Sequence, residues 1–186
     1  ALESSVVIIL GFANLFADGF AMSVGSYLST KSEKENYKKH EKIEYWEVDH
    51  LPEKEKEEIR DIYREKGFEG EILEEIVRTI TADKDRWVDV MMKEELEMSE
   101  ETKSPWAMGA VTFMSFLLFG FIPLLVFVMD YFDLIENQAN IFIYASTLTG
   151  LVFILIGYLK AIVNQTNILR SILETFLLGT AAATLA

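Results

Sequence analysis

The sequence of 186 residues contains no cysteine, only two histidines and only three prolines. The absence of cysteine excludes disulfides, thiolate metal sites and cysteine nucleophiles. Basic residues are also scarce, because 17 lysines and arginines stand against 30 aspartates and glutamates and leave a formal net charge of −13. A nucleic-acid partner requires a basic surface that holds phosphates, so this acidity argues against nucleic-acid binding.

The common enzyme signatures are missing as well. The chain has no GxxxxGK[ST] or GxGxxG phosphate loop, no HExxH zinc motif and no GxSxG nucleophile elbow. Glu47 and His50 form half of a di-iron Glu-x-x-His pattern, but a ferritin-like site needs two such motifs, and Tyr37 stands three residues before His40. We therefore expect neither an enzyme nor an organic cofactor.

Charge and hydropathy are separated along the chain. Residues 31–103 hold 24 of the 30 acids, 15 of the 17 bases and both histidines. The remainder contains long apolar runs at 5–29, 106–129 and 141–159 and a shorter one at 171–186. A helix of about 20 apolar residues crosses the hydrocarbon core, so three runs are long enough and the fourth looks truncated. The expected fold is all-α, a polytopic membrane protein with four visible transmembrane helices and a helical-bundle insert.

The positions of lysine and arginine predict the orientation in the membrane. The segment 130–140 has no basic residue, whereas the ends of the other connections carry Lys31, Lys34, Lys38, Lys39, Lys103, Lys160 and Arg170. Basic residues concentrate on the cytoplasmic side. We therefore expect a membrane helix over 1–30, a cytoplasmic acidic domain over 31–104 and three further membrane helices over 105–186, with 130–140 outside.

Local signals divide the insert into helices. Residues 31–48 contain no glycine or proline, so the first membrane helix should continue into the insert without a break. Pro52 suits the first turn of a second helix, which Gly67 should end. Asp83 is placed to cap a later helix, and Pro105 to restart one into the membrane. The expected third and fourth helices of the insert cover 70–80 and 85–97.

The first apolar run carries a polar stripe. Small and polar residues recur there at spacings of three and four, which places them on one helix face: Gly11, Asn14, Asp18, Met22, Gly25 and Ser29. A carboxylate at the bilayer centre costs roughly 2.5–3.5 kcal/mol, so such a group usually faces a pathway or a partner helix. We interpret Asn14, Asp18 and Met22 as the lining of a transport path. The alternative is that Asp18 is protonated or hydrogen-bonded while the glycines pack helices together.

The insert carries a second group of candidate ligands. Glu41, Glu44 and Glu47 follow one another at three-residue spacing, and a later helix carries Met91, Met92 and Glu95. Carboxylates and thioethers on facing helices could bind a divalent metal. The alternative is a solvated acidic face, which is the usual meaning of such glutamate density and which composition alone favours.

Several blocks of sequence together resemble the vacuolar iron transporter family, in order and over essentially the whole chain. They are GFANLFADGFAMSVGSYLSTKSE, WVDVMMKEEL, SPWAMGAVTFMSFLLFGFIPLL and GYLKAIVNQTNILRSILETFLLGTAAATLA. Members of that family move ferrous iron, and often manganese, across a membrane in exchange for protons. They are dimers with five membrane helices and a cytoplasmic helical domain between the second and third. On this alignment the chain begins at the second helix and lacks the first.

The resemblance also implies roles for particular residues. Met22 matches a conducting methionine of the family's second helix, and Asn14 stands where the family often has glutamate, so that Asp18 would supply the charge. The implied metal ligands of the insert are Glu41, Glu44, Glu47, Met91 and Glu95, with Met92 adjacent and Glu33 as an additional candidate.

These expectations combine into one functional prediction and one rival. The chain is predicted to be a transporter of Fe²⁺, and of Mn²⁺, that works by proton antiport out of the cytosol. Its partners would be membrane lipid, divalent metal ions and a second copy of the chain. The rival is a non-transporting membrane protein whose acidic insert serves dimerisation or partner docking.

Overall fold

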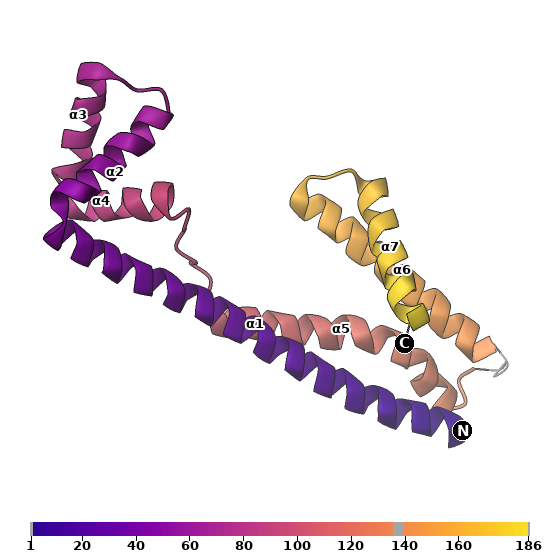
Figure 1. Ribbon diagram of the computed structural model, residues 1–186. Helices are drawn as coiled ribbons and strands as arrows, with labels where there is room; N and C mark the ends of the chain where they lie inside the picture. The colour runs from indigo at the N-terminus through magenta and orange to yellow at the C-terminus, as the bar shows by residue number, and fades with distance from the viewer. Residues whose placement is uncertain (1, 136–139, 186) are drawn as a thin grey trace. The chain divides into compact units, whose positions relative to one another are not determined.

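The computed structural model describes the backbone of residues 2–135 and 140–185 and the side chains of 4–135 and 140–184. These residues form helices and connecting turns without a strand (Figure 1), which confirms the prediction of an all-α protein. The helices are α1 (Leu2–His50), α2 (Pro52–Glu65), α3 (Gly70–Thr81), α4 (Lys84–Val90), the π-helical turn η1 (Met91–Glu95), α5 (Pro105–Tyr131), α6 (Ile141–Asn164) and α7 (Ile168–Leu185).

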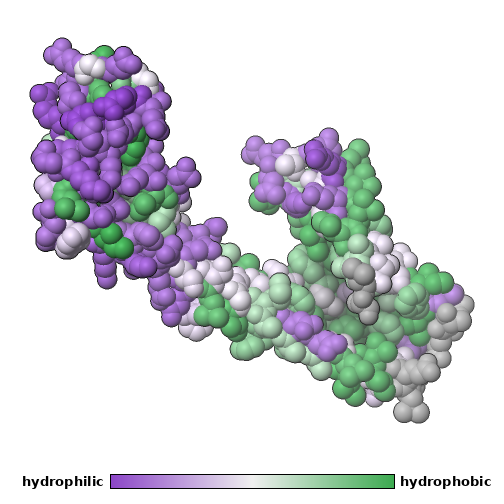
Figure 2. Space-filling view, viewed as in Figure 1, coloured by the Kyte–Doolittle hydropathy of each residue, from purple (hydrophilic) through white to green (hydrophobic). Residues whose placement is uncertain are grey.

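Three of these helices are long and apolar enough to cross a membrane, namely α1, α5 and α6. Hydrophobic residues cover α5 and α6, whereas hydrophilic residues cover α2 and α3 (Figure 2). The fourth predicted span, 171–186, falls on α7 and stays a prediction. The predicted outer connection 130–140 contains residues 136–139, which lie outside the described part of the chain.

The chain divides into two compact units. One unit combines Ala1–Val24 with Gly109–Ala186, and the other is Gly25–Met108. Helix α1 contributes its first half to the former and its second half to the latter. As the lack of glycine and proline predicts, α1 continues without a break from the apolar run into the insert and ends at His50.

In the unit that contains the apolar helices, α1 packs on α5 through two reciprocal glycine–leucine contacts. A methyl group on Gly120 would lie 2.4 Å from Leu15, and one on Gly11 would lie 2.4 Å from Leu124. Each glycine therefore receives the leucine of the opposite helix. Small residues at such contacts let apolar helices approach closely in a membrane, where no hydrophobic effect drives them together.

Two polar pairs connect helices of the same unit. The hydroxyl of Ser4 on α1 donates a hydrogen bond to the buried carboxylate of Asp130 on α5. The Nζ atom of Lys160 on α6 lies 3.0 Å from Oε2 of Glu174 on α7. Because ionisable groups among apolar helices need partners, these pairs help to select which helix faces meet.

The backbones of helices α6 and α7 approach each other closely at Gly157. A methyl group on Gly157 would lie 2.7 Å from Cα of Ile172 and 3.0 Å from the carbonyl oxygen of Ser171, which are backbone atoms that cannot move aside. We expect Gly157→Ala to destabilise the protein by about 1–3 kcal/mol, measured by thermal unfolding of the helical circular dichroism signal in a non-ionic detergent. The control is Gly150→Ala on the same helix, where a methyl group would lie at an ordinary contact distance of 3.4 Å from the ring of Phe176 and the better helix propensity of alanine should be neutral or stabilising. Equal shifts for both variants would contradict this account.

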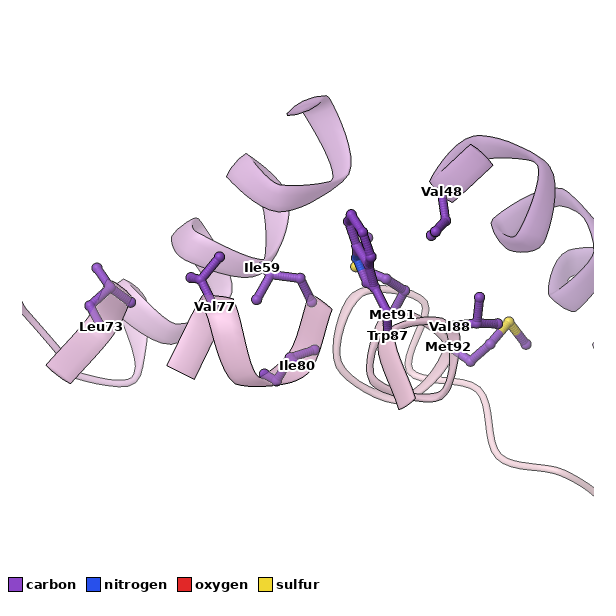
Figure 3. Packing of buried hydrophobic residues seen from close by; sticks show 9 residues of the cluster. All are labelled: Val48, Ile59, Leu73, Val77, Ile80, Trp87, Val88, Met91 and Met92. Carbon is purple, nitrogen blue, oxygen red and sulfur yellow. The ribbon is translucent and has the colours of Figure 1, made fainter. Parts of the chain in front are cut away.

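The unit Gly25–Met108 has its own hydrophobic core. Nine buried side chains from α1, α2, α3, α4 and η1 form it (Figure 3): Val48, Ile59, Leu73, Val77, Ile80, Trp87, Val88, Met91 and Met92. Helix α3 contributes Leu73, Val77 and Ile80, which recur at the spacing of one helix face. The predicted helical bundle is therefore a packed structure with an apolar interior and an acidic surface.

The local signals in the insert act as predicted, with one exception. Pro52 lies in the first turn of α2, Gly67 adopts a left-handed φ of 91° just after it, and Asp83 Oδ1 accepts a hydrogen bond from the amide of Arg86 at 2.8 Å. The exception is the fourth helix, which we expect to reach Glu97 but which ends at Glu95. Its end follows from Glu97, whose left-handed φ of 51° is incompatible with a continuing helix.

Candidate metal centre

Three carboxylates from separate elements meet beside the core of the insert. They belong to Glu44 on α1, Glu55 on α2 and Glu95 on η1, and one oxygen of each lies within 4.8 Å of the others. The three residues are far apart along the chain, so the fold of the bundle brings them together. Oxygen atoms at this mutual distance could share one divalent cation between them.

Two of these carboxylates are buried, yet most of their oxygens accept no hydrogen bond from the described residues. The exposed fraction is 4% for Glu44 and 1% for Glu55. Oε2 of Glu44 and both carboxylate oxygens of Glu55 have no hydrogen-bond partner among the described residues. The nearest cation is Lys54, whose Nζ lies 3.5 Å from Glu55 but 2.8 Å from Glu58. Buried carboxylates without donors are costly, which is why such a site is a candidate for a cation.

The electrostatics of the cluster favour proton binding when no cation is present. Loss of hydration raises the pKa of Glu44 to about 7, and repulsion by Glu95 and Glu55 adds to this effect. Loss of hydration also raises the pKa of Glu55 to about 7, with a further contribution from Glu58. The pKa of Glu95 is raised for the same reasons, although its side chain is the exposed member of the group. The cluster can therefore exchange protons near neutral pH.

The helix registers explain why these glutamates face inward. Glu44 precedes the buried Val48 by four residues, and Glu55 precedes the fully buried Ile59 by four residues. Residues four apart lie on the same face of an α-helix. The apolar contacts that fold the bundle therefore carry both carboxylates out of water.

The third part of the cluster is built by a π-helical turn. The amide of Leu96 donates to the carbonyl of Met91 at 3.2 Å, which is a bond between residues five apart. Met91 and Met92 are both completely buried within this turn, while Glu95 joins the carboxylate group. Single π-helical turns inside helices occur frequently at functional sites.

The structure brings together some of the ligands proposed from the sequence and separates others. Glu44 and Glu95 belong to the group of three, and the half-buried Glu47 adds its charge to all three carboxylates. Glu41 lies one turn earlier on α1 and outside this group. Glu33 also lies outside this group, and its carboxylate accepts a hydrogen bond from Ser29 at 3.0 Å.

Helix α2 contributes Glu55 and Glu58, which were not among the metal ligands predicted from the sequence. Glu55 is the most deeply buried member of the cluster, and the charge of Glu58 acts on all three carboxylates. A signal was available, because Glu55 shares the apolar face of α2 with Ile59. The same three-residue spacing that relates Glu44 to Glu47 on α1 also relates Glu55 to Glu58 on α2.

The residues proposed for the transport path lie on an open face of α1. Asn14, Asp18 and Met22 are all exposed in this single chain, with an exposed fraction of 56% for Met22. Leu15, on another face of the same helix, is buried against α5. Asn14, Asp18 and Met22 are therefore separate from the face that packs within the chain, whereas Gly11, at the start of the polar stripe, packs against Leu124 of α5.

Comparison with known proteins relates the chain to one family. It matches the VIT family over residues 1–186. It is 29% identical to "Vacuolar iron transporter 1" of Arabidopsis thaliana over 97% of this chain and 71% of the relative. It is 34% identical to "Vacuolar iron transporter" of Plasmodium falciparum (isolate 3D7) over 86% of this chain and 60% of the relative. The chain thus spans about three fifths to seven tenths of the length of these relatives. With its three apolar helices, the chain is a multi-pass integral membrane protein, and it belongs to the VIT family.

Proposed function

We propose that this chain forms part of a transporter that moves Fe²⁺, and Mn²⁺, across a membrane, and that Glu44, Glu55 and Glu95 collect the ion. The observation that carries the proposal is the pair of buried glutamates, three of whose four carboxylate oxygens lack a hydrogen-bond partner among the described residues. A divalent cation would replace the lost hydration and offset the mutual repulsion of the carboxylates. The relatives named vacuolar iron transporters support iron as the ion.

The donor set supports a transition metal over Mg²⁺ or Ca²⁺. Both of the latter ions prefer oxygen ligands alone. Met91 is fully buried one turn before Glu95, so a thioether accompanies the carboxylates on the same element. Thioether sulfur favours softer ions such as Fe²⁺, while Mn²⁺ shares the preference for carboxylates.

Proton exchange at the cluster supports antiport. The pKa values of Glu44 and Glu55, both raised to about 7, mean that a cation entering the cluster would displace protons near neutral pH. Asp18, in the apolar part of α1, would lie on the path that carries the ion onward across the membrane. We propose transport out of the cytosol, with the insert on the cytoplasmic side.

The open polar stripe supports a second copy of the chain as partner. Asn14, Asp18 and Met22 would face lipid in an isolated chain, which is costly for a carboxylate. A homodimer would cover this face and enclose a path between two stripes, and lipid would cover the apolar faces that remain.

The test is gradient-driven Fe²⁺ accumulation by the protein in liposomes under anaerobic conditions. We expect a pH gradient to drive uptake, and Glu44→Ala combined with Met91→Ala to lower uptake at limiting Fe²⁺ by at least about tenfold. The matched control is Glu65→Ala combined with Met114→Ala, which removes an exposed carboxylate and an exposed thioether elsewhere. The rival function, an acidic insert that only dimerises or docks a partner, predicts no gradient-driven uptake in any variant.

A further inference from the structure

The second half of α1 carries a row of lysines on one face, immediately after the apolar run. Lys34, Lys38 and Lys42 follow one another at four-residue intervals and form what we call the lysine stripe. Lys31 and Lys39 lie beside it. Glu33, Asn36 and Tyr37 of this stretch line a cleft together with Met98. Lys38 and Lys42 are exposed, whereas Lys34, three residues before Tyr37 on the same side of the helix, is half-buried.

The lysine stripe has no ion-pair partner among the described residues, unlike the basic residues of α2. No described carboxylate lies within 4.0 Å of the ammonium groups of Lys34, Lys38, Lys39 or Lys42. In contrast, every basic residue of α2 has such a carboxylate: Lys54, Lys56, Arg60 and Arg64. Like charges four residues apart lower the stability of a helix. The spacing of the stripe is thus unfavourable for α1 itself, which points to an anionic partner outside the chain.

The local charge contrasts with that of the remaining insert. Residues 31–42 contain five lysines and three glutamates, a formal charge of +2. Residues 43–103 contain 10 basic and 21 acidic residues, a formal charge of −11. An anionic surface would therefore attract this stretch of α1 and repel the bundle of α2, α3 and α4.

An aromatic pair marks the membrane boundary just before the stripe. The rings of Tyr27 and Trp106 lie 4.8 Å apart, and Trp106 is 76% exposed. Tyrosine and tryptophan gather at the level of the lipid headgroups. A helix rises about 1.5 Å per residue, so Lys34 lies about 10 Å, Lys38 about 16 Å and Lys42 about 22 Å beyond Tyr27 along α1.

The lysine side chains lean toward the membrane, which brings their ammonium groups closer to the bilayer than their Cα atoms are. In an α-helix each Cα–Cβ bond tilts toward the N-terminus, and the N-terminal half of α1 is the membrane span. The lysine side chains therefore lean back toward the bilayer, whose headgroup layer extends about 5–7 Å beyond the hydrocarbon. Headgroups that carry several phosphates project further and meet more of the stripe than a single phosphate does.

We propose that the lysine stripe binds the phosphorylated headgroups of anionic phospholipids in the leaflet from which α1 emerges. Juxtamembrane lysines gain affinity for such lipids in proportion to their number and to the charge of the headgroup. The contact would anchor the helix that connects the membrane span to the insert, and it is independent of metal binding at the carboxylate cluster.

The test is native mass spectrometry of the full chain in non-ionic detergent, titrated separately with phosphatidylcholine, phosphatidylserine and phosphatidylinositol bisphosphate. We expect affinity to rise in that order. Replacing the stripe by Lys34→Gln, Lys38→Gln and Lys42→Gln should lower the affinity for phosphatidylinositol bisphosphate by at least about tenfold. The control triple Lys56→Gln, Lys84→Gln and Lys93→Gln removes the same charge from elsewhere in the insert and should bind as the wild type does.

Four outcomes would overturn the proposal. They are wild-type affinity in the stripe variant, equal losses in both triple variants, equal binding of phosphatidylcholine, and equally tight binding of soluble inositol trisphosphate without acyl chains. A change in oligomeric state with unchanged lipid affinity would instead assign the stripe to a second copy and would also overturn it. Should the stripe variant fail to fold, salt titration of the wild type replaces it, because a phosphate contact must weaken steeply with salt whereas phosphatidylcholine binding must not.

Discussion

Glu55→Gln is expected to weaken Mn²⁺ binding by about 10- to 100-fold and, at the same time, to stabilise the metal-free protein at pH 7.5. Glu55 is almost completely buried, and neither of its oxygens has a hydrogen-bond partner among the described residues. A neutral amide of the same shape removes the unfavourable charge and can donate hydrogen bonds to Glu44 and Glu95. The substitution also removes a proposed cation ligand, and changes at a metal site typically lower the metal affinity by about 10- to 100-fold.

The two effects have opposite signs, which distinguishes a metal ligand from a structural residue. Calorimetric titration with Mn²⁺ gives the affinity, and thermal unfolding in the presence of a chelator gives the stability, where we expect a gain of about 1–3 kcal/mol. The matched control is Glu65→Gln on the exposed end of α2, with changes below about 0.5 kcal/mol. A destabilised Glu55→Gln protein with unchanged Mn²⁺ affinity would show that the carboxylate only supports the fold.

The metal-free insert is expected to lose stability as the pH rises from about 5 to about 7.5. The pKa of Glu55 is near 4.5 in the unfolded chain and about 7 in the folded state, mainly because burial disfavours the charged form. Between these values the folded protein retains a proton that the unfolded chain has released. The resulting stabilisation is complete below about pH 4.5 and is lost as the pH rises through 7, and it is of the order of 3 kcal/mol for one such group.

Glu44 contributes in the same direction, and the two groups repel each other, so they lose their protons in succession. The exposed Glu53 and Glu74 have lowered pKa values, because Lys56 and Arg60 bind them, and their opposite slope falls at lower pH. Unfolding curves in chelator from pH 5 to 7.5 measure the effect. A protein with Glu44→Gln, Glu55→Gln and Glu95→Gln should give a flat profile, and a slope retained in that variant would rule out this cluster as its source.

Metal binding should show the reverse dependence on pH. Each proton that the cation displaces lowers the apparent affinity by about tenfold per pH unit below the pKa. Mn²⁺ should consequently stabilise the insert strongly at pH 7.5 and weakly at pH 5. This opposition between proton and metal is the physical requirement for exchange transport.

Much of the architecture could be predicted because its causes are local. Hydropathy marks the runs that become α1, α5 and α6, and the absence of glycine and proline after residue 30 carries α1 to His50. Pro52, Gly67 and Asp83 act within one turn of their own positions. The early end at Glu95 was not predictable in this way, because the left-handed backbone of Glu97 has no glycine to announce it.

The candidate site was predictable only in part. Glutamate spacing and the resemblance to a family indicated Glu44, Met91 and Glu95, but they equally indicated Glu41 and Glu47 on the same helix as Glu44, with Glu33 as an additional candidate. Acidic residues occur throughout the insert, and their spacing along one helix is similar at every turn. What distinguishes Glu44 from Glu41 is that its carboxylate meets those of Glu55 on α2 and Glu95 on η1, and the sequence of α1 alone does not indicate these neighbours.

The sequence by itself determined that this is a helical membrane protein with an acidic insert and a polar stripe on its first span, since hydropathy, charge and capping act between near neighbours. Only the tertiary structure decided which carboxylates lose their water. The burial of Glu55 requires α1, α2 and the π-helical turn to meet around one core, and desolvation is a property of that assembled packing rather than of any residue in it.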